Sequence, residues 1–179
     1  MRSILFFLAV MLTIKASAQL EGSGTRIYLV RHAEKDTGKN PVLTPAGRLR
    51  AGDLLKELKG RHIGRIYTTP YRRTIMTGDS LRLQQGIDTA QYAADTLSQS
   101  LVQSILAKGD LGKTILVIGH SNTIPALIRK LGITGFAPKE LPETEFDNLF
   151  LIDFKKKHTR FTVKKYGQPS VTPVKAAAP

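Results

Sequence analysis

The chain has 179 residues, and its 27 Lys and Arg outnumber its 14 Asp and Glu, which gives a formal charge of +13 at pH 7. It contains no Cys, so disulfides and thiolate metal sites are excluded. The basic surplus favours an anionic partner, but it does not distinguish a phosphorylated small molecule from a nucleic acid or an anionic surface.

Residues 1–18 have the pattern of a secretory signal peptide. Arg2 supplies a positive start, residues 4–14 are largely apolar, and residues 16–18 read A-S-A, a typical cleavage signal. A bilayer span needs about 20 apolar residues, so the apolar segment is too short for one. We therefore expect export, to the periplasm or the medium, with no stable membrane insertion after cleavage. A buried N-terminal helix or a retained anchor is the alternative, and Lys15 beside the cleavage signal keeps it open.

The remaining chain is predicted to form one domain over residues 19–166, followed by a disordered Pro/Ala-rich tail over 167–179. Thr44-Pro45 and Thr69-Pro70 are typical helix starts, because Thr caps free amides and Pro suits the first turn. The β-α-β-α order predicts a largely parallel sheet wrapped by helices. We expect strands at 26–31, 63–68, 114–118, 149–154 and 159–165, helices at 44–60, 69–85, 96–108 and 124–131, and a loop at 136–147.

Two of these strands end in a histidine. The apolar run I-Y-L-V stops at Arg31-His32, the run T-I-L-V-I is followed by Gly and then His120, and Arg72 and Arg73 fall in the first turn of the helix after the second strand. Each feature by itself is usual for a structural histidine or a solvated arginine. The carboxyl ends of parallel strands share one sheet edge, where open α/β sheets bind ligands. Together the features therefore predict a functional site.

Four short motifs resemble those of the histidine phosphatase superfamily, which includes the phosphoglycerate mutases. Residues 31–34 (R-H-A-E) resemble its R-H-G-E signature, and residues 43–47 (L-T-P-A-G) its L-T-x-x-G stretch. Residues 68–77 (T-T-P-Y-R-R-T-I-M-T) resemble S-S-P-x-x-R-A-x-Q-T and place Arg73, not Arg72, at the family arginine; V-I-G-H, which ends at His120, resembles V-x-G-H. The resemblance implies a three-layer α/β/α fold with a mostly parallel central sheet, as in phosphoglycerate mutase.

The chemistry of these residue types suits phosphoryl transfer. A neutral imidazole at His32 is a nucleophile that forms a covalent phosphohistidine. Arg31 and Arg73 supply planar donor forks that fit phosphate, and His120, if protonated, is a third donor. No metal or other cofactor is required for these steps. The expected substrate-binding residues are Arg31, Arg73, His120, Ser121 and Asn122, the last two at a helix start whose amides favour anions.

The proton donor is the weak point of the resemblance. Many relatives carry a glutamate between the second arginine and the second histidine, and here no glutamate occurs between Glu57 and Glu140. Glu34 or Asp95 is the candidate donor. Because a positioned acid contributes about 10²–10⁴ in rate, a substrate with a good leaving group, such as a phosphohistidine or a phosphoanhydride, would need it least.

We expect a phosphatase for a phosphorylated small molecule, with nucleic acid not expected as a partner and the oligomeric state left open. A mutase role is less favoured, because export would separate the chain from cytoplasmic phosphoglycerate. One alternative is an anion-binding protein without catalysis that uses the basic stretch 155–165. Another is a serine esterase built on Ser121 in G-H-S-N-T, with Asp147 or Asp153 and then His158 downstream.

Overall fold

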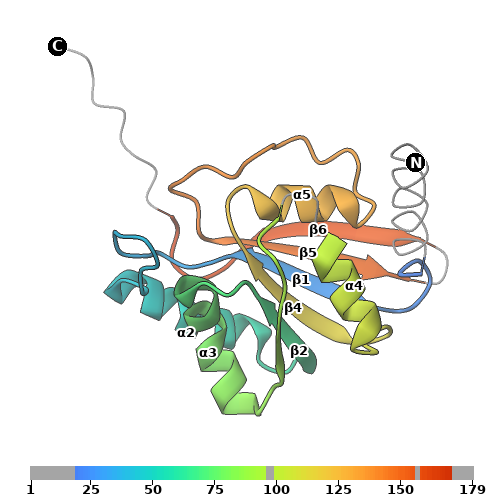
Figure 1. The fold of residues 1–179 in the computed structure, drawn as a ribbon, viewed down its shortest axis with the longest axis horizontal. Helices are drawn as coiled ribbons and strands as arrows, with labels where there is room; N and C mark the ends of the chain where they lie inside the picture. The colour runs from blue at the N-terminus through green and yellow to red at the C-terminus, as the bar shows by residue number, and fades with distance from the viewer. Residues whose placement is uncertain (1–18, 96–98, 156–157, 171–179) are drawn as a thin grey trace, which may run out of the picture.

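The computed structural model describes residues 19–95, 99–155 and 158–170, so the predicted signal peptide and residues 171–179 of the predicted tail lie outside the described chain. The elements, in chain order, are β1 (Arg26–Arg31), α2 (Pro45–Leu58), β2 (Ile63–Thr68), α3 (Arg72–Gln85), β3 (Thr89–Gln91), α4 (Gln99–Ala107), β4 (Thr114–Gly119), α5 (Thr123–Lys130), β5 (Asn148–Phe154) and β6 (Thr159–Lys165) (Figure 1).

These strands form one six-stranded sheet with the order β3-β2-β4-β1-β5-β6. The first four strands in this order are parallel to one another, and β5 and β6 continue the sheet as an antiparallel pair. The fold-class prediction is confirmed, because the sheet is mostly parallel and helices lie on both of its faces (Figure 1). Strand β1 lies inside the sheet, between β4 and β5, so its carboxyl end lies at the middle of the sheet edge.

The alternation of side chains along β1 shows the two layers of core. Ile27 and Leu29 pack with the buried side chains of α4 and α5, whereas Tyr28 and Val30 pack with those of α2 and α3. Successive residues of a strand point to opposite faces, so one apolar run serves both cores. Because both faces are covered, the polar ends of the parallel strands are directed to the sheet edge rather than to a face of the sheet.

The helix starts agree with the sequence in part. Thr44 caps α2 as predicted, its hydroxyl accepting a hydrogen bond from the Gly47 amide at 3.1 Å. Helix α3 begins at Arg72, three residues after Thr69, and its N-cap is Tyr71 with no side-chain cap. The hydroxyl of Thr69 instead contacts His120, so the second Thr-Pro pair builds the site rather than a cap.

Other elements differ from the expectation. Strand β3 occupies residues where only turns were expected; its three residues are too few to show a period in the sequence. Residues 167–170 were predicted to begin the disordered tail, but they are packed: the carbonyl of Gln168 accepts from Arg50, and the amide of Ser170 donates to Asp147. Within the described part of the chain no helix is both long and apolar enough to cross a bilayer.

Candidate active site

The two histidines meet because β1 and β4 pair in register. Arg31 lies opposite Gly119, so the next residue of each strand is a histidine, and the His32 amide donates to the Gly119 carbonyl at 2.9 Å. The ring centroids of His32 and His120 are 5.3 Å apart, with the rings in an edge-to-face arrangement. Parallel pairing thus brings together two imidazoles that are far apart along the chain.

His32 is held as a neutral imidazole with one nitrogen committed. Its Nδ1 lies 2.8 Å from the Ala33 carbonyl, which can only accept, so Nδ1 carries the proton and Nε2 keeps its lone pair. Burial is the main cause that lowers the His32 pKa to about 3, with nearby Arg31, His120 and Arg73 adding to it. At neutral pH the ring is therefore uncharged, and its nucleophilic nitrogen is Nε2.

His120 is also neutral, but its two nitrogens are both engaged. The Arg73 guanidinium can only donate, so His120 Nδ1 accepts from Arg73 Nη2 at 3.3 Å, and Nε2 carries the proton. Nε2 donates to Thr69 Oγ1 at 2.9 Å, and Thr69 in turn contacts Thr74, whose hydroxyl donates to a backbone carbonyl. Burial, reinforced by Arg73, lowers the His120 pKa to about 4. His120 is thus fixed in orientation and, in this state, is not the cationic donor that the sequence allowed.

The Arg31 side chain is buried and held by a segment far along the chain. Its Nη1 donates to the carbonyls of Pro142 and Glu145 at 2.7 and 3.3 Å, and its Nη2 donates to the Glu143 carboxylate at 2.7 Å. The Phe146 ring lies against the guanidinium, 4.3 Å from Cζ to the ring centroid. This arrangement fixes the plane of the donor fork before any ligand binds.

Each guanidinium has a buried donor without a partner. The buried Nε atoms of Arg31 and Arg73 have no hydrogen-bond acceptor among the described residues. The Arg73 guanidinium lies 4.4 Å from the centroid of the Tyr71 ring, and burial lowers the Arg73 pKa. A buried and a partly buried guanidinium, each with an unsatisfied donor, make the site electropositive and suited to an anion rich in acceptor oxygens.

These residues line one open cavity of about 320 Å³. The predicted residues that line it are Arg31, His32, Arg73, His120, Ser121 and Asn122, and Lys35, Tyr71, Ala94, Glu140 and Glu143 complete the wall. Of the two neighbouring arginines, Arg73 lines the cavity, whereas Arg72 lies beside a separate hollow formed by residues 36–42. Among the described residues no group of three or more His, Cys, Asp or Glu side chains is arranged to hold a metal ion.

Comparison with known protein families agrees with this arrangement. The sequence model of the histidine phosphatase superfamily (branch 1) matches residues 27–97, which include nearly all of β1, the loop that follows it, helices α2 and α3 and strands β2 and β3. This region has the sequence of the histidine phosphatase superfamily. Figure 1 shows how the matched region contributes the central strand and the helices of one face of this histidine phosphatase fold.

Solved structures share the histidine phosphatase fold. YhfR of Bacillus stearothermophilus is 18% identical, with a TM-score of 0.60 over 78% of this chain and 96% of that one. A protein assigned as the phosphohistidine phosphatase SixA of Agrobacterium tumefaciens is 20% identical, with a TM-score of 0.59 over 81% and 99%. A phosphoserine phosphatase of Entamoeba histolytica, in complex with phosphoserine, is 17% identical, with a TM-score of 0.56 over 77% and 95%. At these identities the likeness concerns the fold.

The curated relatives carry a different name. A UDP-N-acetylmuramate–L-alanine ligase of Cupriavidus metallidurans is 32% identical over 137 residues, which are 75% of this chain and 28% of the ligase. The ligase of Paraburkholderia phytofirmans is 35% identical over 74% of this chain and 27% of its own length. The chain thus spans about a quarter of the length of the curated relatives that it matches.

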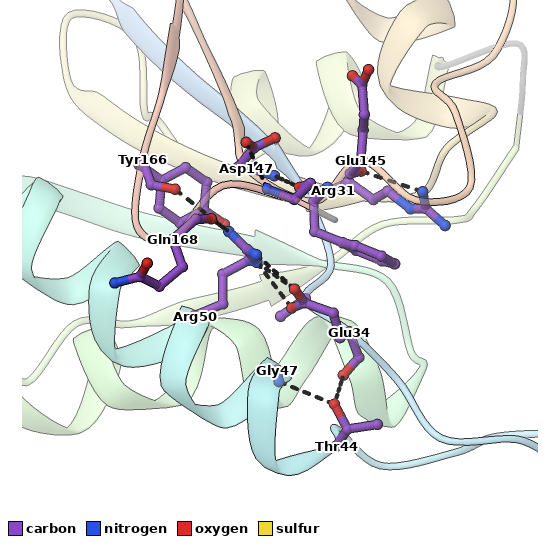
Figure 2. Close-up of polar contacts among 12 residues, drawn as sticks. Arg31, Glu34, Thr44, Gly47, Arg50, Glu145, Asp147, Tyr166 and Gln168 are labelled. Atoms are coloured by element: carbon purple, nitrogen blue, oxygen red, sulfur yellow. Dashed lines mark hydrogen bonds and ion pairs between the residues drawn. The ribbon is translucent and has the colours of Figure 1, made fainter. Parts of the chain in front are cut away.

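Glu34, the first candidate proton donor, does not line the cavity. Its carboxylate forms a two-pronged pair with the buried Arg50, at distances of 2.6 to 2.9 Å (Figure 2). Arg50 also donates to the carbonyls of Tyr166 and Gln168. These bonds connect residues 32–34 (the signature loop) with the end of the described chain. The structure therefore places Glu34 as a support of the loop that carries His32.

The glycine of the L-T-P-A-G motif has a packing role. A Cβ on Gly47 would lie 2.0 Å from the Glu34 carbonyl oxygen, so only glycine lets helix α2 approach the signature loop this closely. The same carbonyl accepts from the Thr44 amide at 3.0 Å (Figure 2 labels all three residues). Two of the four sequence motifs, residues 31–34 and 43–47, thus form one packed unit.

Four aspartates lie between Arg73 and His120 in the sequence. They lie outside the cavity lining as well. Asp95, the other candidate donor, accepts from Ser100 at 2.9 Å. Asp79 pairs with Arg82, and Asp88 lies 3.7 Å from Arg65. Asp110 is fully buried and accepts from Arg65, Tyr67 and Lys113.

Sequence reasoning missed the two carboxylates that line the cavity. Glu140 and Glu143 belong to the loop between α5 and β5, and both accept from the Ser121 hydroxyl, at 2.9 and 3.1 Å. That hydroxyl therefore has carboxylates rather than a histidine as its partners among the described residues, so the triad of a serine esterase is not assembled. The loop has no periodic pattern, and no short-range signal marks these glutamates.

Proposed function

We propose that the chain is a phosphatase that hydrolyses phosphate monoesters, or a phosphohistidine or phosphoanhydride, through a covalent phosphohistidine on His32. The observation that carries the proposal is the Nε2 lone pair of a neutral His32 in a cavity with two guanidinium groups whose buried Nε donors are unused among the described residues. A phosphoryl group needs a nucleophile in line with its leaving group and donors around its equatorial oxygens. The cavity supplies both kinds of group at one sheet edge.

The proposed reaction has two steps. His32 Nε2 attacks phosphorus, a P–N bond forms, and the P–O bond to the leaving group breaks while Arg31 and Arg73 stabilise the charge on the phosphoryl oxygens. The leaving oxygen takes up a proton. Water then attacks the phosphohistidine, the P–N bond breaks, and phosphate leaves with His32 again neutral. The hydrogen bond from Nδ1 to the Ala33 carbonyl keeps the same tautomer through both steps.

The substrate class follows from the cavity and its charge. A volume of about 320 Å³ fits a small phosphorylated molecule or an exposed phosphorylated side chain. Proteins of similar fold are named for phosphoserine and phosphohistidine, which are consistent with either kind of substrate. Arg31, Arg73 and Lys35 surround the phosphoryl end. We therefore propose the phosphoryl group, rather than the alcohol, as the main determinant of binding.

A second candidate function is anion binding without catalysis. The observation in its favour is the Glu143 carboxylate on Arg31, because an internal anion on the donor fork competes with a substrate. On this alternative the chain would bind inorganic phosphate and turn over no ester. The test of the main proposal therefore measures both binding and turnover.

Release of phosphate from nitrophenyl phosphate by the purified protein is the decisive assay. We expect His32→Ala to lose at least about 10³-fold in kcat, because the nucleophile is gone, while still binding inorganic phosphate. The matched control is His158→Ala, which removes an exposed histidine next to β6 and should keep activity. Brief incubation with substrate and a denaturing quench should trap an acid-labile phosphate on the wild-type chain only. Phosphate binding without turnover would support the anion-binding alternative, and hydrolysis of nitrophenyl acetate that requires Ser121 would support an esterase.

A further inference from the structure

The acid that protonates the leaving group has no place in the sequence motifs, but the cavity contains two carboxylates. Among the described residues, Glu140 and Glu143 are the carboxylates that line the same cavity as His32. Glu34 and the aspartates of the Arg73–His120 interval are engaged elsewhere. A proton donor for the leaving group must be within reach of the reacting phosphoryl group. The loop between α5 and β5 is therefore where the acid must be sought.

The two carboxylates share one donor. Ser121 Oγ lies 2.9 Å from Glu140 Oε1 and 3.1 Å from Glu143 Oε1. A hydroxyl has a single hydrogen, so Ser121 serves one carboxylate at a time. Both carboxylates therefore lie within hydrogen-bond distance of the same side chain in the cavity wall.

Glu143 is the member of the pair that binds the phosphate-site arginine. Its other oxygen, Oε2, accepts from Arg31 Nη2 at 2.7 Å. The Arg31 side chain is 3% exposed, whereas that of Glu143 is 74% exposed. A phosphoryl group that takes the Arg31 fork therefore displaces a solvent-accessible carboxylate and leaves the buried arginine in place. The displaced carboxylate then lies beside the bound phosphoryl group.

We propose that Glu143, supplied by the loop between α5 and β5, is the general acid of the reaction. The assignment rests on the proposed phosphatase function. In the first step the O–H bond of the Glu143 carboxylic acid breaks, and its proton goes to the leaving oxygen as the P–O bond breaks and the His32 P–N bond forms. In the second step the Glu143 carboxylate takes a proton from the attacking water, and the P–N bond breaks. The products are an alcohol and phosphate, and the enzyme is restored.

The electrostatics of the ligand-free site agree with this order of events. Partial burial raises the pKa of the Glu143 carboxyl, but the Arg31 guanidinium outweighs this and holds the pKa below its ordinary range. A phosphoryl group that takes the Arg31 donors separates the Glu143 carboxylate from this cation and adds negative charge nearby, and both changes favour the protonated acid. Glu143 therefore gains its proton when the substrate is bound, when the acid is needed.

The test compares leaving groups in Glu143→Gln and in the wild type. Gln keeps the size of the side chain and one acceptor oxygen but cannot give up a proton to the leaving group. With glycerol phosphate, whose leaving group is poor, we expect kcat/KM, which reports the first step, to fall by about 10²–10⁴. With dinitrophenyl phosphate, whose leaving group needs no proton, we expect kcat/KM to change by less than about tenfold. The matched control is Glu57→Gln, whose carboxylate pairs with Lys164 outside the cavity lining.

Each outcome decides the assignment. Two outcomes would overturn the proposal: an equal loss of activity on both substrates, or a fall in KM with unchanged dependence on the leaving group. Either would mean that Glu143 only competes with the substrate for Arg31. If the loss on glycerol phosphate alone occurs in Glu140→Gln and not in Glu143→Gln, Glu140 is the acid. That result would also overturn the proposal. Glu143→Asp, which keeps the acid on a shorter arm, should recover part of the glycerol phosphate activity. A failure of the phosphatase proposal is distinguished by a wild type that turns over neither substrate.

Discussion

The two buried, neutral histidines predict that this chain loses stability between pH 7 and pH 5. Burial lowers the pKa of His32 from 6.5 to about 3 and that of His120 from 6.5 to about 4. In the folded chain both rings therefore stay neutral throughout this window. In the unfolded chain both bind a proton as the pH falls below 6.5, so acid favours the unfolded state.

The size of the effect follows from linkage. One pKa unit corresponds to about 1.4 kcal/mol, so each histidine costs about 2 kcal/mol of folding free energy between pH 7 and pH 5, and the pair about 4 kcal/mol. The sign is set by the lowered folded pKa: stability is fully present above pH 6.5 and is lost progressively down to the folded values. The carboxylates with lowered pKa, Asp110, Asp147 and Glu143, act at lower pH, because their unfolded values lie near 4.

Urea unfolding at pH 7 and pH 5 measures this difference. The chain has no Trp, so far-ultraviolet circular dichroism is the appropriate signal. The difference in unfolding free energy between the two pH values should be about half as large in His32→Asn as in the wild type, and likewise about half as large in His120→Asn. This holds whatever each substitution does to stability at pH 7. A wild-type difference below about 1 kcal/mol, or a difference that both variants retain in full, would refute the claim that these rings are kept neutral by burial.

Two further predictions concern the support of the signature loop. Arg50→Met leaves the Glu34 carboxylate partly buried and unpaired and should destabilise the chain by about 3–5 kcal/mol in urea unfolding, whereas Arg82→Met, which breaks a surface pair on α3, should cost less than about 1 kcal/mol. Equal costs would show that the Arg50 pair is no more than a surface contact. Gly47→Ala should lower the thermal midpoint, since its Cβ meets a backbone oxygen, at a cost of about 1–3 kcal/mol, while Gly52→Ala on the same helix meets no atom within 4 Å and should be neutral or stabilising. A stable Gly47→Ala chain would contradict the close approach.

The part of the site that could be predicted is the part that the pairing of parallel strands brings together. A parallel sheet places every strand's carboxyl end at one edge, so a sequence in which strands stop at Arg31-His32 and before His120 already brings these groups together. The apolar runs of β1 and β4 are long and uninterrupted, and their neighbours are polar, which makes their ends visible without coordinates. The choice of Arg73 over Arg72 follows from motif spacing and agrees with the cavity lining.

The part that could not be predicted depends on contacts between distant segments. Glu143 reaches Arg31 across 112 residues from a loop without periodicity, and nothing in its neighbourhood distinguishes it from a solvated glutamate. Glu34 was expected to give a proton, and its partner Arg50 lies on the next helix among several other arginines. The sequence carries the charges of these groups, but which charges pair is decided by packing.

Arg50 has a consequence for the order in which the molecule is completed. One part of its guanidinium pairs with Glu34 in the loop that follows His32, and another part donates to the carbonyl of Gln168, 118 residues further on. The second contact can form only after Gln168 has been synthesised. The loop beside His32 therefore lacks this support until a segment far along the chain has joined the fold.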